Sequence, residues 1–183
     1  MKTQDLSLFE MPPGFRGRPG WYVQLWWLTQ STLFRCSPQI AYRFRASLLR
    51  LFGARVGANT VIRPSATITY PWKVTLGDRV WIGDDVVLYS LGEINIGSDT
   101  VISQRSYLCA GDHDYQNTSF PIRGRSISIG NECWIATDVY VAPGVSILDQ
   151  VVVGARSSVF SDLQTGMVCV GSPARAVKRR VDR

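Results

Sequence analysis

Aliphatic side chains recur at a spacing of six residues between residues 56 and 159 of this chain. A period of six fits neither an α-helix, which repeats every 3.6 residues, nor an extended strand, which repeats every two. It fits a short strand and a corner, repeated many times. The positions are Val56, Ile62, Ile68, Leu76, Ile82, Leu88, Ile96, Ile102, Leu108, Ile129, Ile135, Val141, Ile147, Val153 and Val159.

The repeat shifts its frame three times, and each shift follows three hexads. Two extra residues precede Leu76, two precede Ile96 and fifteen precede Ile129. Since every insertion leaves from the same corner, three hexads make one coil of a three-sided parallel solenoid, with the aliphatic residues stacked inside. We therefore predict an all-β solenoid of about five coils over residues 56–170. A sandwich of short strands would instead show turn signals every 8 to 12 residues.

Glycine often follows the aliphatic residue of a hexad, as in Val56-Gly57 and Ile82-Gly83. Glycine suits a backbone that turns sharply and is approached closely by its neighbour. We therefore expect glycine to form the corners of the coils.

The largest insertion, residues 110–126, reads AGDHDYQNTSFPIRGRS. It lacks apolar periodicity, so we expect an extended loop that protrudes from the solenoid. Long loops on a rigid scaffold are disproportionately functional. The chain's only histidine, His113, lies at the root of this loop with Asp112 and Asp114 beside it.

Residues 1–55 carry the whole excess of positive charge, with eight Lys and Arg against two Asp and Glu, while the remainder carries twelve of each. We expect a helix from Pro38 to Gly53 that packs as a cap on the open end of the solenoid. Contact with an anionic membrane is the alternative, and both can hold together. The residues for membrane contact would be Arg43, Arg45, Arg50, Trp21, Trp26 and Trp27.

Other features narrow the class of protein. No C-x-x-C pair and no second histidine are present, so we expect no zinc site and no metal, and four reduced, mostly buried cysteines. The first ten residues lack the apolar core of a signal peptide, and no stretch reaches the ~20 apolar residues of a membrane span. We expect a cytoplasmic protein with no nucleic-acid partner. Contact with the inner face of the membrane stays open.

At residue level the chain resembles a known family. The segments GDHDY, CWIATDVYVAPGVSI, VVGARSSV and GSPARAV are similar to those of left-handed β-helix, hexapeptide-repeat O-acetyltransferases of sugars and galactosides. The Trp-rich leader, LLRLFGARVG and YPWKVTLGDRVWIG look closest to acetyltransferases of colanic acid and exopolysaccharide biosynthesis. The resemblance covers nearly the whole chain.

The resemblance implies a homotrimer whose active sites lie in clefts between neighbouring solenoids, with acetyl-CoA along each cleft. His113 matches the family's general base. Trp134 and Thr137 would line the pantetheine arm, and Ala155 would offer its backbone amide there. Arg175 and Lys178, in the basic tail of residues 171–183, would approach the CoA phosphates.

Three departures from the family pattern concern its binding residues. Ser161 stands where many relatives have a lysine near the nucleotide, so phosphate contacts would shift to Arg156 or the tail. Gly83 and Leu91 occupy positions where galactoside acetyltransferases hold the sugar with Asn and Asp. The acceptor is therefore expected to be a different sugar.

Acetyl transfer from a thioester to a hydroxyl needs a base near the alcohol, a polarised carbonyl and two aligned reactants. The imidazole could be oriented by Asp112 or Asp114, by a backbone carbonyl or by a distant acid. A backbone N–H near Thr137 or in the following coil would stabilise the oxyanion. Transfer is expected to be direct, since Cys109 shows no sign of activation. Candidate acceptor contacts are Asp112, Asp114, Tyr115, Tyr89 and Arg105.

The function expected is therefore transfer of an acetyl group from acetyl-CoA to a hydroxyl of a sugar or glycan intermediate in exopolysaccharide biosynthesis. An N-acetyltransferase acting on an amino sugar would use the same base and stays open, as does a non-catalytic trimeric scaffold. A zinc hydrase on this fold needs three histidines. A nucleotidyltransferase needs an α/β domain that the first fifty residues are too short to build.

Overall fold

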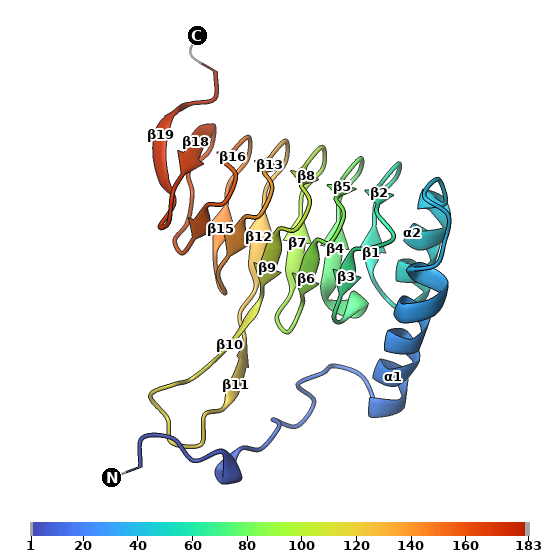
Figure 1. Ribbon diagram of the computed structural model, residues 1–183, viewed down its shortest axis with the longest axis vertical. Coiled ribbons are helices and arrows are strands. Elements are labelled where there is room, and N and C mark those ends of the chain that lie inside the picture. The colour runs from blue at the N-terminus through green and yellow to red at the C-terminus, as the bar shows by residue number, and fades with distance from the viewer. Residues whose placement is uncertain (1, 182–183) are drawn as a thin grey trace.

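The computed structural model describes residues 2–181, so that Met1 and the last two residues of the predicted tail, Asp182 and Arg183, lie outside the described chain. It is a left-handed parallel β-helix with three flat sides. Five complete coils are formed, as predicted, and one further strand begins a sixth (Figure 1).

Each side of the prism is one sheet of short strands, which are parallel except for the last strand of sheet B, β19. Sheet A contains β1 (Arg55–Val56), β4 (Val74–Leu76), β7 (Ile94–Ile96), β12 (Ile127–Ile129) and β15 (Ser146–Ile147). Sheet B contains β2 (Val61–Ile62), β5 (Trp81–Ile82), β8 (Val101–Ile102), β13 (Trp134–Ile135), β16 (Val152–Val153), β18 (Met167–Val170) and β19 (Arg175–Arg179). Sheet C contains β3 (Thr67–Ile68), β6 (Val87–Tyr89), β9 (Tyr107–Cys109), β14 (Tyr140–Val141) and β17 (Ser158–Val159).

The hexad residues form the core, as the spacing predicts. In sheet B, for example, Ile62 pairs with Ile82, Ile82 with Ile102, and Ile102 with Ile135. Every hexad residue except the half-buried Val56 is at most 3% exposed. Because the same position of each coil meets its equivalent in the next, one aliphatic column fills the prism from end to end.

The corners are built differently from the sequence-based expectation. The backbone turns with positive φ at non-glycine residues two positions after the glycine, as at Asp85 (φ 55°), which follows Gly83. Gly83 itself is needed for close approach, because a Cβ there would lie 2.7 Å from the backbone nitrogen of Gln104 in the next coil. The expectation that glycine makes the turn was therefore wrong, and the expectation of close approach was correct.

The helical segment packs on the first coil, as a cap should. α1 (Gly20–Thr29) runs into a π-helical turn, η2 (Gln30–Phe34), and α2 (Tyr42–Leu51) follows beside it (Figure 1). Trp26 and Phe34 are fully buried in the same core cluster as Ile68. The indole Nε1 of Trp26 donates to the Ile68 carbonyl at 2.8 Å. The cap therefore covers apolar side chains that an open end would expose to water.

Two expectations for the second helix need correction. The helix begins at Tyr42 and not at Pro38, because the guanidinium of Arg45 takes the carbonyls of Pro38 and Gln39, at 2.8 and 2.7 Å. Arg45 is completely buried and also donates to the Ile62 carbonyl at 2.6 Å. It ties the cap to the first coil and does not face a membrane.

The insertion of residues 110–126 protrudes from the solenoid, as expected, but part of it forms strands and not a loop. Its base is an antiparallel hairpin of β10 (Gly111–His113) and β11 (Ile122–Gly124), here called the arm, which projects from the corner between sheets C and A (Figure 1). The N-terminal segment, with the short 3-10 helix η1 (Leu6–Leu8), runs beside the arm, and the N–H of Asp5 donates to the Thr118 carbonyl at 2.7 Å.

The chain after the last coil is also ordered. β19 folds back antiparallel to β18 and extends sheet B at the end away from the cap. Part of the predicted basic tail, Arg175–Arg179, is thus a strand. A second short 3-10 helix, η3 (Pro71–Lys73), lies between β3 and β4.

The four cysteines are free. Cys133 and Cys169 are buried, Cys109 is half-buried and Cys36 is exposed, so the expectation of mostly buried thiols holds for only two.

Among residues 2–181, no helix has both the length and the apolar character needed to cross a bilayer.

Candidate active site

His113 is the last residue of β10, and its ring is held from several directions. Its Nδ1 lies 2.9 Å from the backbone carbonyl of Phe120. The Phe120 ring stacks on the imidazole with centroids 4.2 Å apart and an angle of 9°, and the Phe9 ring lies at 6.1 Å. Because a carbonyl only accepts hydrogen bonds, Nδ1 carries a proton, and in the neutral ring the lone pair is on Nε2.

The neighbouring carboxylates do not orient this ring. Asp112 lies opposite Arg123 in the hairpin, and its two oxygens accept from Nε and Nη2 of Arg123 at 2.8 and 3.1 Å. These hydrogen bonds raise the pKa of the Arg123 guanidinium. Asp114 accepts from the backbone N–H of Gln116 at 3.2 Å. Of the expected orienting groups, the structure therefore has the backbone carbonyl.

The other candidate acceptor contacts are spread over two places. Tyr115 lies in the turn region between β10 and β11 and is 74% exposed. Tyr89 lies at the base of the arm, on the outer surface of sheet C. Arg105 lies at the corner between sheets B and C, where Asp138 holds its guanidinium at 2.7 and 2.9 Å. Arg105 is therefore not beside His113 in the same chain but at the corner that carries Thr137, and its contact with an acceptor stays a prediction.

An aromatic column runs from Tyr89 along the outer surface of sheet C. Successive ring centroids of Tyr89, Tyr107, Tyr140 and Phe160 are 5.9, 6.3 and 5.9 Å apart. Partial burial raises the pKa of both Tyr107 and Tyr140 to about 12, so both phenols stay neutral at physiological pH. The column is thus an uncharged surface with hydroxyl groups, next to the root of the arm.

The residues expected to contact pantetheine lie together on sheet B. Trp134 is 49% exposed, and its indole Nε1 donates to Ser103 Oγ at 3.0 Å. Thr137 and Ala155 occupy equivalent corners of successive coils, where the N–H of Arg156 donates to the Thr137 carbonyl at 2.9 Å. The N–H of Ala155 has no acceptor within residues 2–181. An amide available to a ligand is therefore present where it is expected.

Arg175 and Lys178 lie on β19 of the same sheet. Lys178 pairs with Val168, Val168 with Val152, and Val152 with Trp134, so these four residues form one row across the strands. With strands about 4.8 Å apart, Trp134 and Lys178 are separated by roughly 14 Å along the sheet. Both basic residues are exposed. We call the row formed by Trp134, Val152, Val168 and Lys178 the sheet B row. It is one half of the predicted site.

The position of Leu91 is consistent with a changed acceptor. Leu91 is 5% exposed and packs in a small apolar cluster with Val23 and Tyr70. A carboxylate would be poorly solvated in this environment.

The described residues contain no group of three or more His, Cys, Asp or Glu side chains suited to a metal ion.

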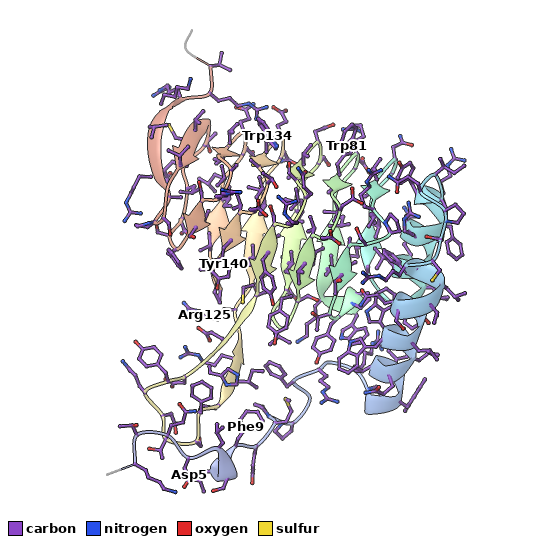
Figure 2. All side chains as sticks on the ribbon, viewed as in Figure 1. Asp5, Phe9, Trp81, Arg125, Trp134 and Tyr140 are labelled. Atoms are coloured by element: carbon purple, nitrogen blue, oxygen red, sulfur yellow. The ribbon has the colours of Figure 1, made fainter. Side chains whose placement is uncertain are left out.

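The two halves of the predicted site are not brought together within one chain. The arm leaves from the corner between sheets C and A, whereas Trp134 and β19 are on sheet B, on the opposite side of the prism. Figure 2 shows Trp134 on the upper edge and Arg125, at the base of the arm, on the lower edge. One chain therefore does not bring the arm and sheet B together, within the residues described.

Sequence reasoning missed the two phenylalanines that hold His113. Phe9 is more than a hundred residues away in sequence, and no pattern connects it to the arm. Phe120 could have been found from the hairpin, since pairing of His113 with Ile122 brings residue 120 to the same end.

Coils of three hexads, an ordered arm carrying a lone imidazole and an edge strand carrying three cations, Arg175, Lys178 and Arg179, are the features expected of a hexapeptide-repeat acyltransferase. No family model matches the chain. A curated relative, the putative colanic acid biosynthesis acetyltransferase WcaF of Escherichia coli (strain K12), is 60% identical over 98% of both chains. The protein belongs to this family of colanic acid biosynthesis acetyltransferases.

Solved structures share the fold at lower identity. One is a hexapeptide-repeat acetyltransferase of Vibrio cholerae complexed with acetyl coenzyme A, with a TM-score of 0.79, 22% identity, and coverage of 92% of this chain and 88% of that chain. Another is galactoside acetyltransferase in complex with coenzyme A, with a TM-score of 0.74, 24% identity, and coverage of 93% and 84%.

Proposed function

We propose that this enzyme transfers an acetyl group from acetyl-CoA to a hydroxyl of a sugar or glycan intermediate in exopolysaccharide biosynthesis. The enzyme would be a homotrimer, with His113 of one subunit facing the sheet B row of the next. The observation that carries the proposal is the geometry of His113, whose Nδ1 bonds to the Phe120 carbonyl and whose Nε2 is left as a base. Membership of the family of colanic acid biosynthesis acetyltransferases supports acetyl as the group that is transferred. The exposed Arg175 and Lys178 are suited to binding the phosphates of CoA.

In the proposed reaction, Nε2 of His113 accepts the proton of the acceptor hydroxyl while the oxygen attacks the thioester carbonyl. The tetrahedral intermediate carries its negative charge on the former carbonyl oxygen, and a backbone N–H near Thr137 is a candidate donor to it. When the carbon–sulfur bond breaks, the imidazolium returns the proton to the CoA thiolate. Acetyl ester and free CoA are the products, so no acetyl-enzyme is required.

Replacing His113 with alanine tests the proposal. We expect acetyl-CoA-dependent acetylation to fall by ~10²-fold or more, because general base catalysis contributes this much. The assay would follow thiol release with free sugars, amino sugars and lipid-linked glycans as acceptors, and would measure circular dichroism and molecular mass in parallel. The matched control is Cys109→Ser, a nearby half-buried side chain with no part in the mechanism.

The outcomes separate the proposed functions. Unchanged turnover in a folded His113→Ala protein would contradict catalysis by His113. Absence of thiol release by the wild-type enzyme with every acceptor would leave the scaffold alternative. Turnover confined to the amino sugars would favour N-acetylation.

A further inference from the structure

The helical cap has a second apolar side that the fold does not use. On α1, Val23 and Trp26 are fully buried against the solenoid, whereas Trp21, Leu25 and Leu28 are 69%, 45% and 61% exposed. The last three are spaced i, i+4, i+7 and share one side of the helix. α1 is therefore apolar on both sides, and only one of them is covered.

The other two elements of the cap, η2 and α2, also carry exposed apolar side chains. Leu33 is 59% exposed, Phe44 is 43% exposed and Leu51 is 74% exposed. Single exposed apolar residues are common on soluble proteins, but an accumulation on one element pair marks a binding surface. We define the cap surface as the exposed residues Trp21, Leu25, Leu28, Leu33, Phe44 and Leu51.

The charge around the cap surface has one sign. No Asp or Glu occurs between Glu10 and Asp78, while nine Lys and Arg lie in this interval. Arg35 and Arg43 are exposed, and neither makes an ion pair within residues 2–181. Arg45 does not contribute, since it is buried. The partner of this surface must therefore present negative charge and an apolar interior together.

We propose that the cap surface docks on a phospholipid bilayer that contains anionic headgroups. Such a bilayer accepts Trp and Leu side chains below its headgroups and attracts arginines at its surface. A second copy of the same surface would bring like charges together at close range. Because α1 and η2 are too short to cross a bilayer, the helix lies in the plane of the interface.

Docking would also indicate the class of acceptor. This one step rests on the proposed function. A protein held at the membrane by its cap would meet glycans that are attached to a lipid carrier, so lipid-linked sugars would be the acceptor class. Docking itself is measured without acetyl-CoA or acceptor, so its failure is distinguishable from failure of the catalytic proposal.

Flotation with vesicles tests the inference. We expect the full-length protein to bind vesicles of 70% phosphatidylcholine and 30% phosphatidylglycerol, to bind pure phosphatidylcholine weakly, and to be released by salt. The triple variant Trp21→Ser/Leu25→Ser/Leu28→Ser should lower the partition coefficient by roughly tenfold or more, because it removes the apolar side chains that would enter the bilayer. Arg35→Gln/Arg43→Gln should lower it by about fivefold per arginine on anionic vesicles only.

Matched controls are available at the other end of the solenoid. Leu148→Ser removes an exposed leucine, and Arg156→Gln/Arg179→Gln removes two exposed charges. Both controls should bind vesicles as the wild-type protein does. No flotation of wild-type protein, or binding that survives both cap variants, would overturn the proposal. So would a larger soluble assembly that the triple serine variant dissolves, since a second copy would then cover the surface.

Discussion

The imidazole of His113 interacts with a backbone carbonyl at 2.9 Å and with a parallel phenyl ring at 4.2 Å. A carboxylate at Nδ1 would both orient the ring and stabilise its positive charge, whereas a carbonyl mainly orients it. The proposed base therefore depends on position more than on a charged partner. The position comes from Phe120, which supplies both the carbonyl and the stacking ring.

Phe120→Ala keeps the carbonyl and removes the stacking surface. We expect kcat to fall about tenfold to a hundredfold, because misplacement of a catalytic group by about 1 Å has effects of this size. The KM for acetyl-CoA should change little, since its expected contacts are on sheet B. Phe120→Leu should recover part of the rate, and an unchanged kcat in both variants would contradict a positioning role.

The corners of the solenoid offer a second test at single residues. Gly83→Ala should destabilise the protein by roughly 1–3 kcal/mol, because its Cβ would overlap the backbone of the next coil. Asp85→Gly, two positions later, should change the free energy of unfolding by less than about 1 kcal/mol, since it exchanges αL strain for chain entropy. Denaturant unfolding of both variants checks this, and the reverse order would show that the glycine makes the turn.

At the level of elements, the sequence predicts some parts of the molecule much better than others. The strands were predictable because each hexad residue meets its equivalent in the next coil, so one local pattern repeats throughout the core. The sequence predicts an extended loop at the arm and no strands, because Gly111–His113 and Ile122–Gly124 show no alternation of polar and apolar residues. The start of α2 was misplaced because the tertiary bonds of Arg45 compete for the carbonyls of its first turn.

The N-terminal segment is an element whose role only the structure reveals. It contacts the arm through Asp5 and Phe9, and farther along the chain Lys73 donates to the Phe15 carbonyl at 2.7 Å. Burial at this anchor lowers the pKa of Lys73. The segment therefore links the arm to the body of the solenoid near the cap.

Deletion of residues 2–9 should separate catalysis from stability. These residues add no buried apolar side chain, so Tm should change by no more than about 2 °C. Acetyl transfer should fall about tenfold, since the arm and the ring of His113 lose a contact. Equal rates for the truncated and full-length enzymes would show that the segment is not needed to hold the arm.

At the scale of the whole molecule, the arm and the sheet B row lie on opposite sides of one prism. Sequence motifs assign residues to both halves, and the resemblance implies sites between neighbouring solenoids. The structure adds which sides of one prism carry the two halves. In the proposed trimer, cyclic symmetry would bring the arm of each copy to the sheet B row of its neighbour. The proposed trimer would then contain three equivalent sites, each shared between two subunits.

Mixed assemblies test the sharing directly. His113→Ala and Trp134→Ala proteins should each be nearly inactive alone. After denaturation and refolding together in equal amounts, about one quarter of the sites should combine the two intact halves, so activity should return to about a quarter of the wild-type value. No recovery, with trimers shown to have mixed by mass, would place both residues in a site within one chain.

The separation of the two halves also has a consequence during synthesis. In the proposed trimer, the arm of a polypeptide serves one neighbour while its basic strand serves the other. A newly made chain that has folded but not yet found its companions therefore holds two unfinished sites and consumes no acetyl-CoA. Catalysis would begin only on assembly, and it would disappear on dilution below the concentration at which the subunits separate.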